Sequence, residues 1–282
     1  MKIEISPASA AQAVAALFGR GQSETPLTDV EVARSLLQRE GAYDPSLDKR
    51  LLLAALRLIH RRPWQFKTCP TLCFVGKGGA NKSTATTQFA VIAAAKGLRT
   101  LVLDCDRQRS VSSWSKARGD DPHITVRACE YNKIETSCSE GRKEGFHLIL
   151  VDHPQQPGEA WPALVRSTDQ FLLLARPSLF DLATAQQWIR HLEVHQAPYL
   201  VVLSSAAPRR EMIDNPAMRD ARKSLQTRTS HIWSGQITAR QPIVTATALG
   251  RGIIEFEPAG PASAEYLVLW HRVLQTIKRR TS

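Results

Sequence analysis

Residues 76–84, GKGGANKST, combine the residue types that bind phosphate groups. They follow a short apolar run and precede a helical pattern. A glycine-rich turn in this setting points backbone N–H groups at one spot, and the helix N-terminus adds partial positive charge there. Gly76, Gly78 and Gly79 permit the tight turn. Lys82 is placed to reach the β and γ phosphates, and the Ser83 hydroxyl to ligate Mg²⁺.

Asn81 occupies a position of this loop that is usually glycine. That position often requires a positive φ, and asparagine tolerates the left-handed region better than other non-glycine residues. We therefore expect the loop to be bent but intact. The alternative is a glycine-rich turn that binds no ligand.

Three aspartates follow apolar runs further along the chain. Asp104 and Asp106 end and follow LVLD, and Asp152 ends LILVD. Carboxyl ends of parallel strands meet at the edge of an open α/β sheet where ligands bind, and a carboxylate there holds Mg²⁺ or its water shell. Taken singly, each aspartate is equally well explained as a helix N-cap. Taken together with the loop, they predict a magnesium-dependent phosphate site.

Short apolar runs alternate with helical stretches from residue 70 onward. We expect strands at residues 71–75, 100–104, 124–128, 147–152, 170–175 and 199–204. Strands separated by helices indicate βαβ units and a mostly parallel sheet with helices on both faces. A last helix carries Tyr266, Trp270, Val273, Leu274 and Ile277 at helical spacing, which predicts that it packs on the sheet domain.

Residues 1–66 read differently, as a small module of three helices before an α/β domain at residues 67–282. Thr28 and Glu31 form a capping box, Gly41 ends that helix, and a third helix stops before Pro63. Two interpretations remain open for this module. It is either a helix-turn-helix reader of operator DNA or a surface for dimerisation or partner docking.

The composition bounds the class of protein. Lysine plus arginine number 37 against 26 for aspartate plus glutamate, a formal charge of +11, which suggests a polyanionic partner such as DNA, RNA or an acidic membrane. A solvated basic surface with no partner is the plain alternative. The five cysteines are odd in number and form no CxxC, which favours a reducing compartment. Without an N-terminal apolar run or a long apolar segment, we expect a soluble cytoplasmic protein.

Three motifs carry a resemblance to a known family. The loop KGGANKST (77–84) resembles the deviant Walker A motif of the ParA/MinD ATPases, DCDRQ (104–108) their second motif, and VDHP (151–154) their Walker B motif. The resemblance continues through residues 110–117, 175–189 and 235–269, and covers roughly residues 70 to 278. It is greatest to the ParA branch of DNA-partition ATPases, especially its compact ParF-like members.

The resemblance implies a P-loop NTPase fold and ATP with Mg²⁺ as cofactors. It implies that Lys77 is the signature lysine, which crosses a dimer interface to the partner's nucleotide, and that Asp106 positions the attacking water. Ser83, Asp104 and Asp152 would serve the metal. The nucleotide would contact Gly78, Gly79, Ala80, Asn81, Lys82, Ser83 and Thr84.

The chain departs from the family pattern in three places. Asn81 replaces glycine, Arg107 replaces proline in DRQ, and VVLSSAAP lacks the asparagine that reads the base in many members. Ser204 is then the expected, weaker, reader of the base. These departures leave the fold intact and bear on turnover and nucleotide selectivity.

The resemblance also implies a DNA-binding cycle. An ATP-bound homodimer would coat nonspecific DNA on the nucleoid, and a ParB-like centromere-binding protein would release it by stimulating slow hydrolysis. The function implied is plasmid or chromosome partition. The expected DNA-binding residues are Arg209, Arg210, Arg219, Arg222, Lys223, Arg240 and Arg251.

Two other functions remain open. The first is a MinD-like membrane-cycling ATPase, for which the last helix, ending in Lys278, Arg279 and Arg280, would have to insert into lipid. The second is a DNA-binding repressor or adaptor that does not hydrolyse ATP and keeps only a vestigial nucleotide site.

Overall fold

The computed structural model describes residue 66 and residues 68–154, 159, 161–208, 215–258 and 260–281, with the backbone alone for 278–281. The helical module expected at residues 1–66 lies outside the described residues, except for Phe66. Arg209 and Arg210 lie outside them too, as do the side chains of Lys278, Arg279 and Arg280. These predictions stay predictions.

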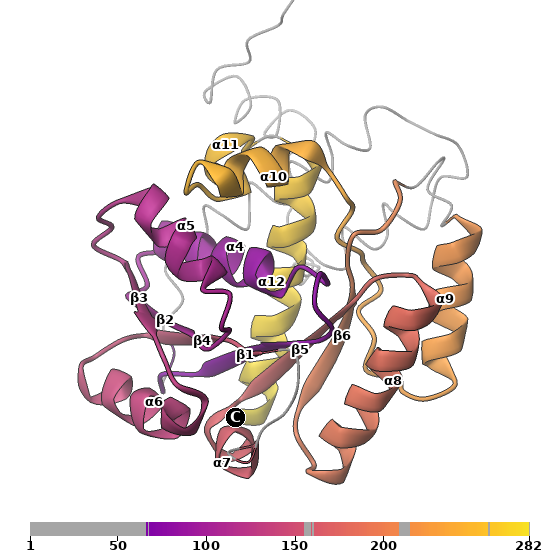
Figure 1. The fold of residues 1–282 in the computed structure, drawn as a ribbon, viewed down its shortest axis with the longest axis horizontal. Coiled ribbons are helices and arrows are strands. Elements are labelled where there is room, and N and C mark those ends of the chain that lie inside the picture. The colour runs from indigo at the N-terminus through magenta and orange to yellow at the C-terminus, as the bar shows by residue number, and fades with distance from the viewer. Residues whose placement is uncertain are drawn as a thin grey trace, which may run out of the picture.

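One sheet of six parallel strands forms the centre of the fold, in the order β3-β2-β4-β1-β5-β6 (Figure 1). The strands are β1 (Thr71–Val75), β2 (Thr100–Asp104), β3 (Ile124–Ala128), β4 (Leu148–Asp152), β5 (Gln170–Ala175) and β6 (Tyr199–Leu203). This confirms the predicted α/β class, and every predicted strand is present to within one residue at either end.

Helices cover both faces of the sheet (Figure 1). One face carries α4 (Lys82–Ala95), α5 (Ser110–Arg118), α10 (Gln241–Ala248), α11 (Ile253–Phe256) and α12 (Pro261–Thr281). The other carries α6 (Ile134–Lys143), α7 (Trp161–Ser167), α8 (Leu179–Val194) and α9 (Pro216–Gln226), with a 3₁₀ turn, η1 (Tyr131–Lys133), before α6. The five strands other than β3 are buried along their whole length and mostly apolar because helices cover both faces, whereas the edge strand β3 is only partly buried.

Successive residues of β1 divide between two cores. Leu72 and Phe74 face the α4 side, and Cys73 and Val75 face the α8 side. Side chains alternate along a strand, so each central strand supplies both cores. The strand before the phosphate-binding loop is therefore fixed from above and below.

The last helix packs on the domain as its apolar spacing predicts. Tyr266, Trp270 and Val273 are buried in the core beneath α4. The Trp270 ring meets the Phe89 ring of α4 edge to face, with centroids 5.3 Å apart. No helix within the described ranges is long and apolar enough to cross a membrane.

Candidate nucleotide-binding site

The glycine-rich loop lies between β1 and α4, at the carboxyl end of the sheet (Figure 1). Gly76 has φ 137° and Gly79 has φ 78°, conformations that side chains with a Cβ rarely adopt. A Cβ on Gly76 would lie 2.3 Å from the carbonyl oxygen of Leu174 in β5. Both glycines are therefore required by the backbone, and the loop is tightly seated on the neighbouring strand.

Asn81 adopts the conformation that its position predicts. Its φ is 65° and its ψ is 29°, in the left-handed region. The side-chain amide donates a 2.7 Å hydrogen bond to Oγ of Ser205, which itself has φ 49°. Asparagine thus keeps the bend that glycine would give and adds a link from the loop to the chain that leaves β6.

Lys82 is buried at the start of α4, with 5% of its surface exposed. Its Nζ donates to the backbone oxygen of Lys77 at 3.4 Å. Burial lowers the pKa of Lys82, and the nearby carboxylates of Asp152 and Asp106 act in the opposite direction. An ammonium group in this position is directed back over the loop, where it can meet phosphate oxygens.

Ser83 and Asp152 are joined directly. The Ser83 hydroxyl donates to Asp152 Oδ2 at 2.6 Å, while the buried Oδ1 of Asp152 has no hydrogen-bond partner among the described residues. Burial raises the pKa of Asp152 to about 7, although the Ser83 hydroxyl and Lys82 counteract it. A hydroxyl and a carboxylate with a free oxygen fit the oxygen-rich shell that Mg²⁺ takes.

Asp104 and Asp106 have different surroundings despite their spacing. Asp104 is fully buried, and its Oδ2 accepts hydrogen bonds from the backbone N–H (2.8 Å) and hydroxyl (2.6 Å) of Ser112 in α5. Its Oδ1 has no partner in the described part of the chain. Asp106 is half-buried and accepts from the Gln108 N–H at 3.0 Å. Asp104 anchors α5 as well as facing Asp152 across the β2–β4 register.

Lys77 is half-exposed and leans toward the start of α8. Its Nζ lies 5.9 Å from the centre of the Phe180 ring. Phe180 and its neighbour Leu179 are 74% and 78% exposed, large apolar groups beside the loop. Burial acts to raise the pKa of Asp181, but hydrogen bonds from Ser178 and Arg176, together with the Lys77 charge, lower it.

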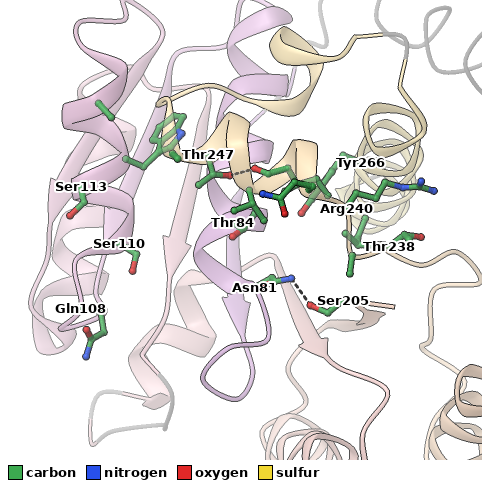
Figure 2. A pocket seen from close by; sticks show the side chains of 18 residues that line it. Asn81, Thr84, Gln108, Ser110, Ser113, Ser205, Thr238, Arg240, Thr247 and Tyr266 are labelled. Atoms are coloured by element: carbon green, nitrogen blue, oxygen red, sulfur yellow. Dashed lines mark hydrogen bonds between the residues drawn. The ribbon is translucent and has the colours of Figure 1, made fainter. Parts of the chain in front are cut away.

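A cavity of about 820 Å³ opens beside the loop (Figure 2). Its lining comes from the start of α4, from α5 and α10, from the segment after β6 and from one residue of α12. Its lining comprises Asn81, Thr84, Gln108, Ser110, Ser113, Trp114, Ala117, Ser205, Ile237, Thr238, Ala239, Arg240, Gln241, Ile243, Val244, Thr247, Ala248 and Tyr266. The volume lies in the range of small-molecule pockets, so the cavity is large enough for a nucleoside whose phosphates would lie on the loop.

The prediction that Ser204 reads the base is wrong. Ser204 is fully buried, and its hydroxyl donates to the backbone oxygen of Ala80 at 2.9 Å, which fixes the loop from below. Ser205, one residue later, lines the cavity instead (Figure 2). Trp114 lines the cavity as well, and its place in the segment that follows DCDRQ is a sequence signal for it.

The basic residues of the last third of the domain are not equivalent. Arg219 and Lys223 are exposed on α9. Arg222 instead donates to the backbone oxygens of Trp233 (3.0 Å) and Gly235 (2.8 Å). Arg240 pairs with Glu265 at 3.3 Å, and Arg251 donates to the Glu255 backbone oxygen at 2.7 Å. Arg251 is exposed like Arg219 and Lys223, whereas Arg222 and Arg240 are half-buried. Arg222, Arg240 and Arg251 also hold the fold through these contacts.

Residues 73–253 match the family described as the CobQ/CobB/MinD/ParA nucleotide binding domain. The chain belongs to this family. ATP and Mg²⁺ are the cofactors of such a domain, and the loop, with Lys82, Ser83 and Asp152, has the chemistry that fits them. No curated protein matches the chain in a direct search.

Solved structures support the same fold. A chain of a MinC:MinD cell division protein complex from Aquifex aeolicus has a TM-score of 0.60 and 20% identity, over 73% of this chain and 96% of that one. McdA from Cyanothece has 0.58 and 16%, over 73% and 99%. A plasmid partition protein from Borrelia burgdorferi bound to AMPPNP has 0.55 and 12%, over 76% and 100%. At these identities the likeness concerns the fold alone.

Proposed function

We propose that the chain is an ATPase of the DNA-partition type. Two copies, each with ATP bound, form a dimer that coats DNA without regard to sequence. A ParB-like centromere-binding protein then stimulates hydrolysis and releases the dimer from DNA. The plasmid partition protein of Borrelia burgdorferi among the similar structures is in keeping with this proposal.

The observation that carries the ATPase proposal is the set of charged and polar groups gathered at the loop. Lys82 lies buried over it, Ser83 contacts Asp152, and Asp106 lies close enough to affect the pKa of Lys82. Phosphoryl transfer depends mostly on positioning and on neutralising charge, which such a constellation provides.

The residues act in distinct ways in this proposal. The loop N–H groups and Lys82 hold the phosphates, and Thr84 supports them from the lining of the cavity. Mg²⁺, when bound, would neutralise phosphate charge, with Ser83 and Asp152 as its holders and Asp104 behind them. Asp106 orients the attacking water. Lys77 reaches the nucleotide of the second copy, which makes hydrolysis depend on dimerisation.

The packing of α12 favours DNA over a membrane surface as the partner. Its apolar stripe, including Tyr266 and Trp270, is used against the core. A helix that inserts into lipid needs a free apolar face. Arg219 and Lys223, by contrast, present exposed charge on α9, and phosphate contacts of this kind need no base recognition.

Retention of the purified full-length chain on DNA of unrelated sequence tests the proposal. We expect retention with ATP that is lost with ADP or without nucleotide, and that weakens as salt is raised. Equal retention in every nucleotide state would favour the repressor or adaptor instead. ATP-dependent sedimentation with acidic liposomes, without DNA retention, would favour the membrane-cycling ATPase.

An Asp106→Ala variant tests the link between hydrolysis and release. It should bind ATP, remain dimeric and stay on DNA, because the attacking water is no longer oriented. Size-exclusion chromatography with ATP measures this, with the wild-type chain as the control. A variant that stays monomeric with ATP would contradict the role given to Asp106.

A further inference from the structure

Arg176 is a further positive charge at the phosphate-binding loop, and none of the roles above uses it. It is the first residue after β5, the strand that lies beside β1 in the sheet. The β5 backbone supports the start of the loop, as the contact between Gly76 and the Leu174 carbonyl shows. The strand that seats the loop therefore also brings Arg176 to it.

The guanidinium of Arg176 lies against Gly79. A Cβ built on Gly79 would be 3.6 Å from Nη1, 3.7 Å from Cζ and 3.8 Å from Nη2. Because the three distances are nearly equal, the guanidinium plane lies across the glycine. Gly79 is exposed and belongs to the glycine-rich loop, whose N–H groups are expected to bind the phosphates. The cation is thus held at the rim of the phosphate site.

Asp181 holds this guanidinium in place. Arg176 Nε lies 3.2 Å from Asp181 Oδ1, and Nη2 lies 3.3 Å from Oδ2. Both contacts are longer than the 2.7–2.9 Å typical of charge-assisted hydrogen bonds. Asp181 is 3% exposed and is fixed by the Ser178 hydroxyl, whereas the Arg176 side chain is 40% exposed. Asp181 is therefore the fixed partner of the pair, and the more exposed Arg176 side chain has room to move.

We propose that Arg176 binds the terminal phosphate of a nucleoside triphosphate held in the same protomer, and that Asp181 retains the guanidinium when that phosphate is absent. This inference rests on the nucleotide binding proposed above. The planar fork of arginine matches two phosphate oxygens, and a phosphate offers it shorter contacts than Asp181 does. A diphosphate lacks the terminal group, so Arg176 is the residue that favours the triphosphate.

This role differs from that of Lys77. Lys77 is expected to act on the nucleotide of a second copy, whereas Arg176 acts on its own. Discrimination between ATP and ADP would then begin in the single protomer, before two copies meet. Lys77 and Arg176 both influence Asp181, so one carboxylate balances both cations.

Calorimetric titration of the full-length chain with Mg²⁺ and either AMPPNP or ADP tests the proposal. We expect Arg176→Gln to weaken AMPPNP binding about tenfold, as for loss of a hydrogen-bonded charge, and to leave ADP binding unchanged. Arg176→Lys keeps the charge without the fork and should fall between Arg176→Gln and the wild type. Equal loss for both nucleotides, or loss for neither, would overturn the proposal.

Asp181→Asn separates phosphate binding from mere support of α8. It breaks the same ion pair but leaves the arginine free, so AMPPNP should bind more tightly than to the wild type. If the pair only stabilises the fold, Asp181→Asn will weaken binding as Arg176→Gln does, and the proposal fails. A wild-type chain that binds neither nucleotide would overturn the proposed function itself, and this inference with it.

Discussion

Charged side chains have different surroundings at the phosphate-binding loop and on the basic face of α9. At the loop, Lys82 and Asp152 are buried, and the charge of each shifts the pKa of the other. On α9, Arg219 and Lys223 face solvent, while Arg222 between them is used on backbone carbonyls. The role of a charged residue at the loop therefore depends on its buried neighbours. The role of a charged residue on α9 depends on whether its side of the helix faces solvent or the fold.

The largest effect on nucleotide binding should come from a substitution among the buried charges at the loop. Lys82→Ala should lower affinity for ATP by about a hundredfold or more, because a charge that meets phosphate is removed. Its free energy of unfolding should fall as well, because buried Asp152 loses the cation that favours its charged form. Titration calorimetry and urea unfolding measure the two. Unchanged affinity would show that Lys82 does not touch phosphate.

His153, next to Asp152, makes the stability of the fold depend on pH. It is fully buried, with the Trp161 and Trp188 ring centroids each 5.6 Å away, and burial lowers its pKa to about 3 although a hydrogen bond to the Pro154 oxygen opposes this. Between the ordinary pKa of 6.5 and about 3, only the unfolded chain binds the proton. Stability is therefore complete above the ordinary pKa and is lost as pH falls.

We expect the wild type to lose about 2 kcal/mol of unfolding free energy between pH 7.5 and pH 5 through this residue. His153→Asn retains an amide N–H for the Pro154 oxygen but does not titrate, so its loss over the same range should be smaller by that amount. Urea unfolding at the two pH values measures the difference. Parallel losses in both proteins would contradict the buried neutral histidine.

Arg222→Ala sharpens the contrast on α9. Two hydrogen bonds to the carbonyls of Trp233 and Gly235 disappear, so the unfolding free energy should fall by about 1–2 kcal/mol. DNA retention by the folded protein should change little, because that guanidinium is already engaged. Weaker retention with normal stability would return Arg222 to the DNA-binding set.

The double variant Arg219→Ala, Lys223→Ala is the control for Arg222→Ala on the same helix. It should have the smallest effect on the fold. Stability should stay within about 0.5 kcal/mol of wild type, because both side chains are exposed. The slope of log affinity for DNA against log salt should decrease by about two, one for each phosphate that the variant no longer neutralises. An unchanged slope would remove α9 from the DNA-binding surface.

Much of this arrangement is readable in the sequence for physical reasons. Strands buried on both faces are apolar throughout, so their extents can be read almost to the residue. The left-handed bend at Asn81 follows from the tolerance of asparagine for positive φ. The three motif aspartates are brought to one edge because parallel strands end there.

The remainder depends on contacts between distant segments. Ser204 and Ser205 are adjacent, and only the path of the chain after β6, with φ 49° at Ser205, decides which one faces the cavity. Arg176 reaches the loop because β5 lies beside β1, an order that no local pattern reveals. For Arg222 a signal did exist, because it lies one turn after the buried Met218.

The packing of α12 has a consequence for how the protein is made. Among the described elements, β1 and α4 are synthesised early, and they pack against Trp270 and its neighbours in α12, the last of these elements. Contacts between such distant segments form late, because the intervening chain must be ordered first. The loop therefore acquires the support of α12 only after residues 261–281 have been synthesised, and we expect a chain that lacks them to bind nucleotide weakly.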